Sequence, residues 1–213
     1  AFEALGIGEG DTVVTSPFSF VASANAVRLA GADPVFADVD EETFTLDPDA
    51  VEAAVREHDA DAVLVVHLYG LPAEMDRLAE VADAHDVELV EDAAQAHGAE
   101  YDGRRVGSFG DAACFSFYPT KNVTTGEGGM VTTDRSGVAD RTASFVNHGR
   151  PMGDDRSSYD HVRLGHNFRM TSVAAAIGRA QLERLPEFNE ARRANAAYLT
   201  DRLERSSMTT PVE

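Results

Sequence analysis

An α/β fold built around a mostly parallel β-sheet is the architecture that this sequence predicts. Short apolar, β-branched runs recur along the chain, and longer segments with helical spacing separate the first four of them. The run VELVED (87–92) has the composition of a strand that is buried on both faces. This alternation indicates parallel strands with helices on both sides of the sheet.

Six segments are expected to be strands. In chain order they cover residues 12–17, 34–39, 62–70, 87–92, 113–118 and 129–133. Pro119 ends the fifth strand because proline cannot donate to a strand ladder, and GEGG (126–129) supplies a flexible turn into the sixth.

Helices are expected between these strands and after the last one. The segments with helical spacing are 20–32, 48–58, 72–86, 137–146 and about 172–205. The second and third begin with proline, which is favoured in the first turn of a helix. The polar loop 149–165 is rich in glycine and charge, so we expect it at the surface or at a partner interface. Residues 1–11 read as the end of a helix, which predicts a fragment of a longer protein.

Composition narrows the range of partners. The 213 residues carry a formal net charge of −19, which argues against sequence-independent binding to nucleic acid or to an anionic membrane. The single cysteine, Cys114, excludes an internal disulfide and has the neighbours of a core strand residue. The sequence contains neither a run of about 18 apolar residues nor a signal peptide at its start, so a cytoplasmic protein is expected.

The acidic surface makes a prediction about salt. An excess of carboxylates with almost no lysine suggests a halophilic protein, in which screening relieves charge repulsion; an ordinary acidic cytosolic protein is the alternative. We expect the free energy of unfolding to rise between low and molar KCl. Chemical denaturation at each salt concentration measures it, and a stability that does not rise with salt would contradict the halophilic interpretation.

Familiar nucleotide and hydrolase motifs are missing from the sequence. G-x-G-x-x-G fails after Gly6 and again after Gly126, and no G-x-x-x-x-G-K-[ST] segment occurs. Ser116 lies in C-F-S-F without the flanking glycines of a nucleophile elbow, and the histidines lack metal-ligand spacing. The sequence therefore lacks the marks of an NAD-binding, P-loop or α/β-hydrolase protein.

Lysine is used once in the chain. Of the 18 basic residues, 17 are arginine and one is Lys121, which lies just beyond the strand that carries Ser116. A neutral lysine amine can attack a carbonyl to form a Schiff base, whereas a guanidinium stays protonated. A solvated surface lysine is the alternative, and it fits poorly because every other cation is arginine.

Asp92 ends a buried strand at the edge where open α/β sheets bind ligands. The alternative is a helix N-cap for the following AAQAHG segment. A lysine that forms a Schiff base and an aspartate beside a pyridine nitrogen are the two groups that pyridoxal phosphate (PLP) enzymes require.

The chain resembles the DegT/DnrJ/EryC1/StrS aminotransferases, fold-type I PLP enzymes that aminate nucleotide-linked keto sugars. The resemblance runs in order to about Leu185 and includes LGIGEGDTVVTSPFSFVASANAV, VVHLYGLPAEMD, VEDAAQAHGAEYDGRRVGSFGDAACFSFYPTKNVTTGEGGMVTTD and LGHNFRMTSVAAAIGRAQLERL. So long an ordered match is highly specific. It implies the large domain of this fold type, with a mostly parallel sheet of the seven-stranded type.

The resemblance also assigns roles to residues. It implies that Lys121 holds PLP as an internal aldimine, that Asp92 pairs with the pyridinium nitrogen, and that Gln95, one helical turn on, reaches the phenolic oxygen of the ring. Phe20 would stack on the ring, although alone it reads as a core residue. The remaining assignments concern the cofactor phosphate: Ser116 would bind it, and Asn167 or Arg169 would reach it from the second subunit of a homodimer. For Asn167 and Arg169 the alternative is a helix-entry asparagine or a surface cation. The role of His148 stays open between substrate contact and helix cap.

The function implied by the resemblance is a ping-pong transfer of an amino group, with glutamate as the expected donor and a nucleotide-linked keto sugar as acceptor. The family has a phosphate-binding turn upstream of the matching segment and a small domain after it. We therefore expect residues 1–185 to be a PLP-binding large domain without that turn, and 186–213 to lead toward a truncated C-terminal domain. The alternatives are a PLP-dependent sugar dehydratase, which has histidine in place of the lysine, a non-catalytic PLP- or sugar-binding regulator, and a domain without cofactor.

Overall fold

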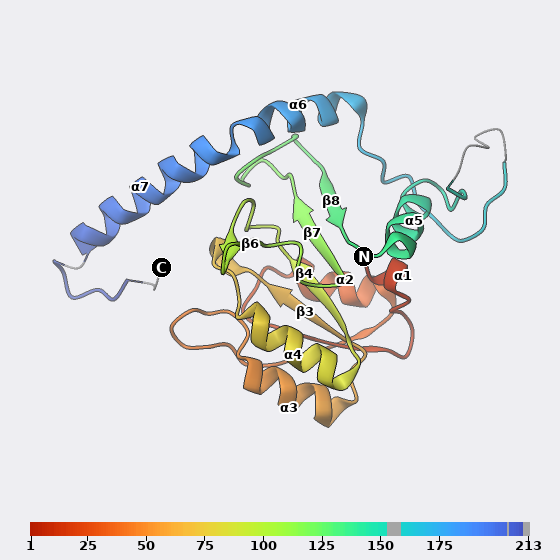
Figure 1. The fold of residues 1–213 in the computed structure, drawn as a ribbon, viewed down its shortest axis with the longest axis horizontal. Coiled ribbons are helices and arrows are strands. Elements are labelled where there is room, and N and C mark those ends of the chain that lie inside the picture. Colours follow the sequence, from red (N-terminus) through yellow and green to blue (C-terminus); the bar gives the residue numbers. More distant parts are fainter. Residues whose placement is uncertain (153–158, 204, 211–213) are drawn as a thin grey trace.

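The computed structural model describes residues 1–152, 159–203 and 205–210. Its main feature is a sheet with the strand order β2-β1-β3-β4-β7-β8 (Figure 1). These strands are β1 (Thr12–Thr15), β2 (Asp33–Phe36), β3 (Ala62–Val66), β4 (Glu88–Asp92), β7 (Ala112–Ser116) and β8 (Gly129–Thr132). All neighbours pair in parallel except β7 and β8, which are antiparallel. The expected α/β class is confirmed, with six strands in this sheet among the described residues.

Helices occupy the segments that their spacing predicted. They are α1 (Phe2–Leu5), α2 (Ala22–Ala30), α3 (Pro48–His58), α4 (Met75–His85), α5 (Ser136–Phe145), α6 (Ser172–Glu183) and α7 (Leu185–Leu203). At the start of α3, the Asp47 carboxylate accepts a hydrogen bond from the amide of Asp49 at 2.9 Å, with Pro48 in the first turn. Thr171 caps α6 in the same way through the amide of Ala174 at 3.1 Å.

The expected start of the third helix at Pro72 is wrong. Helix α4 begins at Met75, because the Ala73 amide donates to Nδ1 of His67 at 3.2 Å and the chain there stays extended. A short 3₁₀ turn, η1 (Leu68–Gly70), lies between β3 and this segment. A two-stranded hairpin of β5 (Glu100–Tyr101) and β6 (Arg104–Arg105) was also not predicted, because two-residue strands carry no hydrophobic period.

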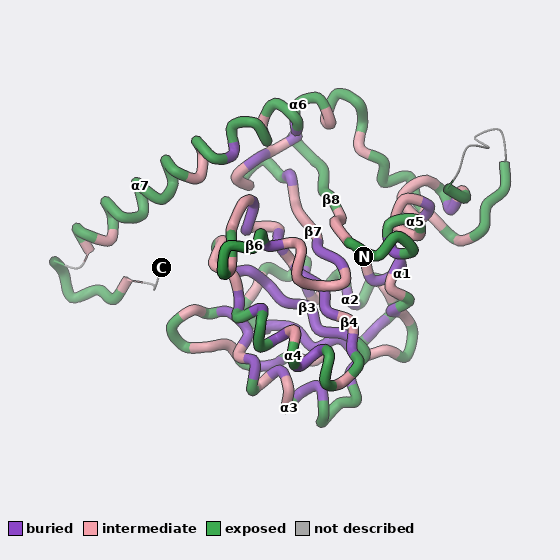
Figure 2. Tube along the Cα trace, viewed as in Figure 1, coloured by how far each residue is buried: buried purple, intermediate pink, exposed green. Residues whose placement is uncertain are grey.

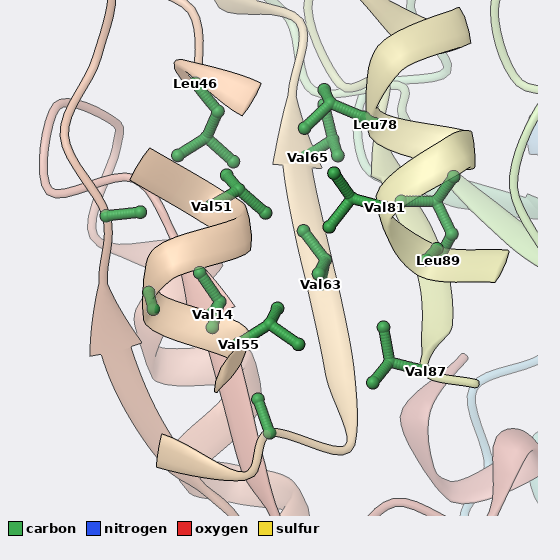
Figure 3. Packing of buried hydrophobic residues seen from close by; sticks show 14 of the residues in the cluster. Val14, Leu46, Val51, Val55, Val63, Val65, Leu78, Val81, Val87 and Leu89 are labelled. Carbon is green, nitrogen blue, oxygen red and sulfur yellow. The ribbon is translucent and has the colours of Figure 1, made fainter. Parts of the chain in front are cut away.

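Helices cover both faces of the sheet. On one face, Val63 and Val65 of β3 pack with Val51 of α3 and Leu78 of α4, and Figure 3 shows these side chains pointing toward one another. On the other face, Leu64 of β3 packs in a second cluster of buried residues with Phe2, Ile7 and Val27. Alternate residues of one strand therefore fill two cores, as expected for a central parallel strand.

Helices α6 and α7 lie nearly end to end along one side of the molecule (Figure 1). Most of their surface is exposed (Figure 2), including Val173 at 72% and Tyr198 at 57%. Helix α7 begins at Leu185, where the sequence predicts the end of the large domain, and that division stays a prediction. In the described residues, no helix combines the length and the apolar character that crossing a membrane requires.

The loop expected at 149–165 lies partly outside the described residues. Of its described part, Met152 and Tyr159 are exposed, at 56% and 85%. Cys114 lies in β7 as expected and is partly buried, and burial raises the pKa of its thiol.

Candidate active site

The carboxyl ends of four strands meet around an open pocket of about 740 Å³. The pocket is lined by Ser19, Phe20, Ala22, Ser23, Val66, Asp92, Ala94, Gln95, Ser116, Tyr118, Thr120, Lys121 and Glu127. These residues end or follow β1, β3, β4 and β7, so the pocket lies at the edge of the sheet where parallel α/β folds bind ligands. Five residues predicted to bind the cofactor come together here: Phe20, Asp92, Gln95, Ser116 and Lys121.

Asp92 is held in place by two hydrogen-bond donors. Its Oδ2 accepts from the hydroxyl of Ser23 at 2.7 Å, and its Oδ1 accepts from the amide of Ala94 at 3.1 Å. Ser23 is only 4% exposed, and its hydroxyl also contacts that of Ser19 at 3.0 Å. The alternative role of Asp92 as a helix N-cap is wrong, because the residues after it form turns. The carboxylate therefore faces the pocket in a fixed orientation.

Ser23 and Ser19 are site residues that sequence reasoning missed. Ser19 lies between β1 and α2, and Ser23 lies in the first turn of α2, within the stretch 20–32 that the sequence predicts only as helix. Their signal would have been small polar residues one helical turn apart, beside a strand end, and this pattern is common at helix starts without any function.

Lys121 projects from the loop that follows β7. Its amide donates to the carbonyl of Tyr118 at 3.0 Å, and two residues on, Val123 is buried with 1% exposure. The lysine itself is half-buried and lines the same pocket as Asp92. This placement differs from that of a solvated surface lysine.

Gln95 lies in a turn and not one helical turn beyond Asp92, which corrects the expected local structure. Its side-chain oxygen accepts a hydrogen bond from the amide of Tyr69 at 2.6 Å. Tyr69 has a left-handed backbone (φ 57°), which is unfavourable for an aromatic residue and which this bond helps to hold. With its oxygen engaged, Gln95 presents its amide nitrogen as the group available to a ligand.

Phe20 follows β1 and Ser116 ends β7, which are the two outermost of the four strands at the pocket. The alternative placement of Phe20 in the core is wrong, because its side chain is among the exposed apolar ones, at 70%. An exposed aromatic ring at a pocket is a surface on which a planar ligand can stack. The Ser116 hydroxyl accepts from the amide of Tyr118 at 3.3 Å and keeps its own hydrogen to donate.

Asn167 and Arg169 do not line this pocket. Asn167 pairs with Asn147 in an isolated antiparallel bridge, and Arg169 donates to the side-chain oxygen of Asn147 at 2.8 Å. Arg169 instead lines a second cavity of about 730 Å³ beside β8 and α5. His148 also lies outside the pocket; it is exposed, and its amide donates to the carbonyl of His166 at 2.9 Å.

A buried histidine–carboxylate pair lies next to Asp92, one residue earlier in β4. Glu91 and His67 are both fully buried, and Nε2 of His67 lies 3.1 Å from the Glu91 carboxylate. The amides of Gly107, Phe109 and Gly110 also donate to Glu91, at 2.7–2.8 Å. Because Nδ1 of His67 accepts from the Ala73 amide, the histidine hydrogen is on Nε2. Glu91 therefore fastens two loops to β4, one residue before Asp92.

The donor set of the pocket fits PLP. Lys121 provides an amine for the aldehyde, Asp92 a fixed carboxylate for the ring nitrogen, and Phe20 an aromatic face for the ring. Ser116 and the amide nitrogen of Gln95 add neutral donors for anionic oxygens. The described residues contain no cluster of side chains suited to a metal ion.

Comparison with solved structures defines the class of fold. The X-ray structure of the aminotransferase from Psychrobacter cryohalolentis superposes with a TM-score of 0.91 and 40% identity, over 96% of this chain and 53% of that one. The chain thus has the fold of aminotransferase structures. The model of the DegT/DnrJ/EryC1/StrS aminotransferase family matches residues 1–213, and the chain belongs to this family.

Curated relatives include sugar aminotransferases. The dTDP-3-amino-3,4,6-trideoxy-alpha-D-glucose transaminase of Streptomyces venezuelae is 45% identical over 202 residues, covering 94% of this chain and 52% of the relative. GDP-perosamine synthase of Escherichia coli O157:H7 is 41% identical over 188 residues, covering 88% of this chain and 50% of the relative. The chain therefore spans about half the length of the curated relatives it matches.

Proposed function

We propose that this chain is the cofactor-bearing part of a PLP-dependent aminotransferase that moves an amino group from an amino acid to a nucleotide-linked keto sugar. The observation that carries the proposal is the placement of the single lysine, Lys121, in one pocket with the doubly hydrogen-bonded Asp92. The names of the two curated relatives support the sugar substrate. Glutamate is the proposed donor.

In this proposal, bound PLP supplies an aldehyde that takes up the amino group and a ring that accepts electrons from the substrate. Lys121 would hold the aldehyde carbon, and its free amine would move a proton between the substrate carbon and the cofactor. Asp92 keeps the ring nitrogen protonated, and Ser23 and Ala94 keep the carboxylate oriented for that task. Phe20 would stack on the ring, Gln95 would donate to its phenolic oxygen, and Ser116 would donate to the phosphate.

A homodimer is part of the proposal. Asn167 and Arg169 lie outside the pocket of their own chain, so either would serve the phosphate only in a neighbouring copy. Helix α6 and the segment before it expose apolar side chains, among them Phe168 at 65% and Val173 at 72%. Exposed apolar surface of this kind is typical of an interface. A cytoplasmic location is proposed with it.

The first half-reaction tests the function. We expect protein saturated with PLP to show a band near about 410–430 nm that moves toward about 330 nm when glutamate is added, with one equivalent of 2-oxoglutarate formed. D-glutamate is the control. Lys121 would reach the ring from one side only, so we expect only one enantiomer of glutamate to present its α-hydrogen to the amine.

The outcome separates the proposal from its alternatives. A band that ignores every amino donor would favour a non-catalytic PLP- or sugar-binding regulator. Protein that stays colourless with PLP would favour a domain without cofactor. Loss of oxygen from the keto sugar without amination would favour the dehydratase, against which Lys121 itself argues.

A further inference from the structure

One side chain of α7 joins the two loops that carry Lys121 and Gln95. The Asn189 side chain accepts a hydrogen bond from Nδ2 of Asn122 at 2.9 Å and donates one to the carbonyl of His97 at 2.8 Å. The carbonyl of His97 can only accept, so the amide nitrogen of Asn189 must face it and the amide oxygen must face Asn122. Asn122 follows Lys121 directly, and His97 lies two residues after Gln95.

The same turn of α7 packs closely on both loops. Leu185 forms a buried cluster with Val123 and Phe117, at 9%, 1% and 7% exposure. At Gly98, whose backbone is left-handed (φ 76°), an added Cβ would lie 3.0 Å from the amide nitrogen of Asn189. A residue larger than glycine at position 98 would therefore press against the Asn189 side chain.

Past this turn, α7 is exposed. The residues from Glu190 to Leu199 are all exposed, among them Asn195. Asn189 is partly buried and its side chain bonds to both loops, whereas Asn195 is exposed and offers a matched position on the same helix.

The ring of His97, the residue to which Asn189 donates, packs beside the strand and loop that lead to Lys121. Its ring is 4% exposed and packs against Phe115 and Phe117, with ring centroids 5.5 and 5.8 Å away. Burial lowers the pKa of His97; the nearby carbonyl of Ser116 opposes this effect, and the positive charge of Lys121 adds to it. The ring of His97 therefore contacts Phe117, which packs with Val123 beside Lys121.

We propose that Asn189 is a positioning residue for Lys121. By fixing Asn122 and the carbonyl of His97 to one another, it holds the Lys121 loop against the Gln95 loop and limits the directions in which the amine can point. The effect of Asn189 on turnover rests on the proposed function, whereas its effect on the orientation of Lys121 does not.

The single lysine allows a test without cofactor. In this chain, ¹³C reductive methylation labels Lys121 and the terminal amine only, so the Lys121 methyl signal in NMR reports its surroundings directly. Acetylation of unmodified Lys121 by acetic anhydride, followed by mass spectrometry, measures its accessibility. We expect Asn189→Ala to shift and sharpen the methyl signal and to accelerate acetylation by about fivefold for each hydrogen bond lost. Asn195→Ala is expected to match the wild type in both measurements.

A second variant separates the two bonds. Asn189→Asp keeps an acceptor for Asn122 but turns a second acceptor oxygen toward the carbonyl of His97, so we expect the bond to His97 to be lost and both the methyl signal and the acetylation rate to depart from those of the wild type. If Asn189→Ala fails to fold, as judged by circular dichroism, Asn189→Asp decides the question alone. A folded Asn189 variant with the Lys121 signal and acetylation rate of the wild type overturns the proposal.

The catalytic consequence is measured separately. In protein loaded with PLP, Asn189→Ala should lower kcat and leave the KM for the amino donor nearly unchanged, because the residue lies behind the lysine and not in the pocket. If the wild type proves inactive while the cofactor-free measurements respond as expected, the proposed function fails and the positioning role stands.

Discussion

Replacing Lys121 with arginine is expected to abolish covalent attachment of PLP and to lower the transamination rate by about 10³-fold or more. Arginine keeps the positive charge and the reach of the side chain, but it stays protonated and cannot take a proton from the substrate. Borohydride reduction of the PLP-treated protein, followed by peptide mapping, measures the attachment, and a coupled assay of 2-oxoglutarate measures the rate.

The chain offers a control of identical composition. The double variant Lys121→Arg with Arg179→Lys moves the one lysine to an exposed position on α6 and leaves the net charge unchanged. It should bind no more PLP through a side-chain amine than Lys121→Arg alone. Attachment at residue 179 comparable to that at Lys121 in the wild type would mean that the pocket does not select the amine.

Replacing Glu91 with glutamine is expected to lower the free energy of unfolding by roughly 2–6 kcal/mol, because two buried donors would lose their acceptor at about 1–3 kcal/mol each. Four donors point at the two carboxylate oxygens: three backbone amides and His67. Glutamine has the same size, but its NH₂ group would face two of those donors and leave them unsatisfied. Urea denaturation measures the loss. Glu88→Gln is the control, because this residue of β4 pairs with the exposed Arg135, and such a pair contributes at most about 1 kcal/mol.

The same carboxylate predicts a pH dependence. Burial alone would raise the pKa of Glu91, but hydrogen bonds from His67, Gly110 and Gly107 outweigh burial and hold it below its ordinary value of 4.5. The folded state therefore binds the proton less readily than the unfolded chain. Its contribution to stability is complete above about pH 4.5 and is lost as the pH falls through the folded pKa. Below pH 4.5 the stability of Glu91→Gln should fall less steeply than that of the wild type, and parallel curves would contradict this account.

The strands and most helices followed from the sequence because each has a hydrophobic period that its burial enforces. Val63 and Val65 face one core, and Ala62 and Leu64 face the other. The continuous apolar run AVLVV therefore predicts a strand that is buried on both faces. The start of α4 was misplaced because a tertiary contact decided it: Ala73 donates to His67, and no local pattern reports that bond.

The candidate site could be predicted only in part, because some of its residues act through contacts that are distant in the sequence. Lys121 was conspicuous because it is the one lysine, and Asp92 because it ends a buried strand. Ser23, Glu91 and Asn189 each bond a partner that lies 24 to 92 residues away in the chain, and these residue types are common at helix starts, in strands and on helices. Contacts at such separations are a property of the fold, so they emerge only when the loops are placed in space.

The alternation along β4 limits how this protein can change length. Because neighbouring residues of a strand point to opposite faces, Glu91 joins the anchoring network on one side while Asp92 meets Ser23 on the other. A one-residue insertion or deletion within β4 would exchange these two carboxylates and disable structure and chemistry together. Insertions and deletions are therefore tolerable in exposed connections such as Asp102–Gly103 of the β5–β6 hairpin. In β4 only substitutions are tolerable, because they leave the strand register unchanged.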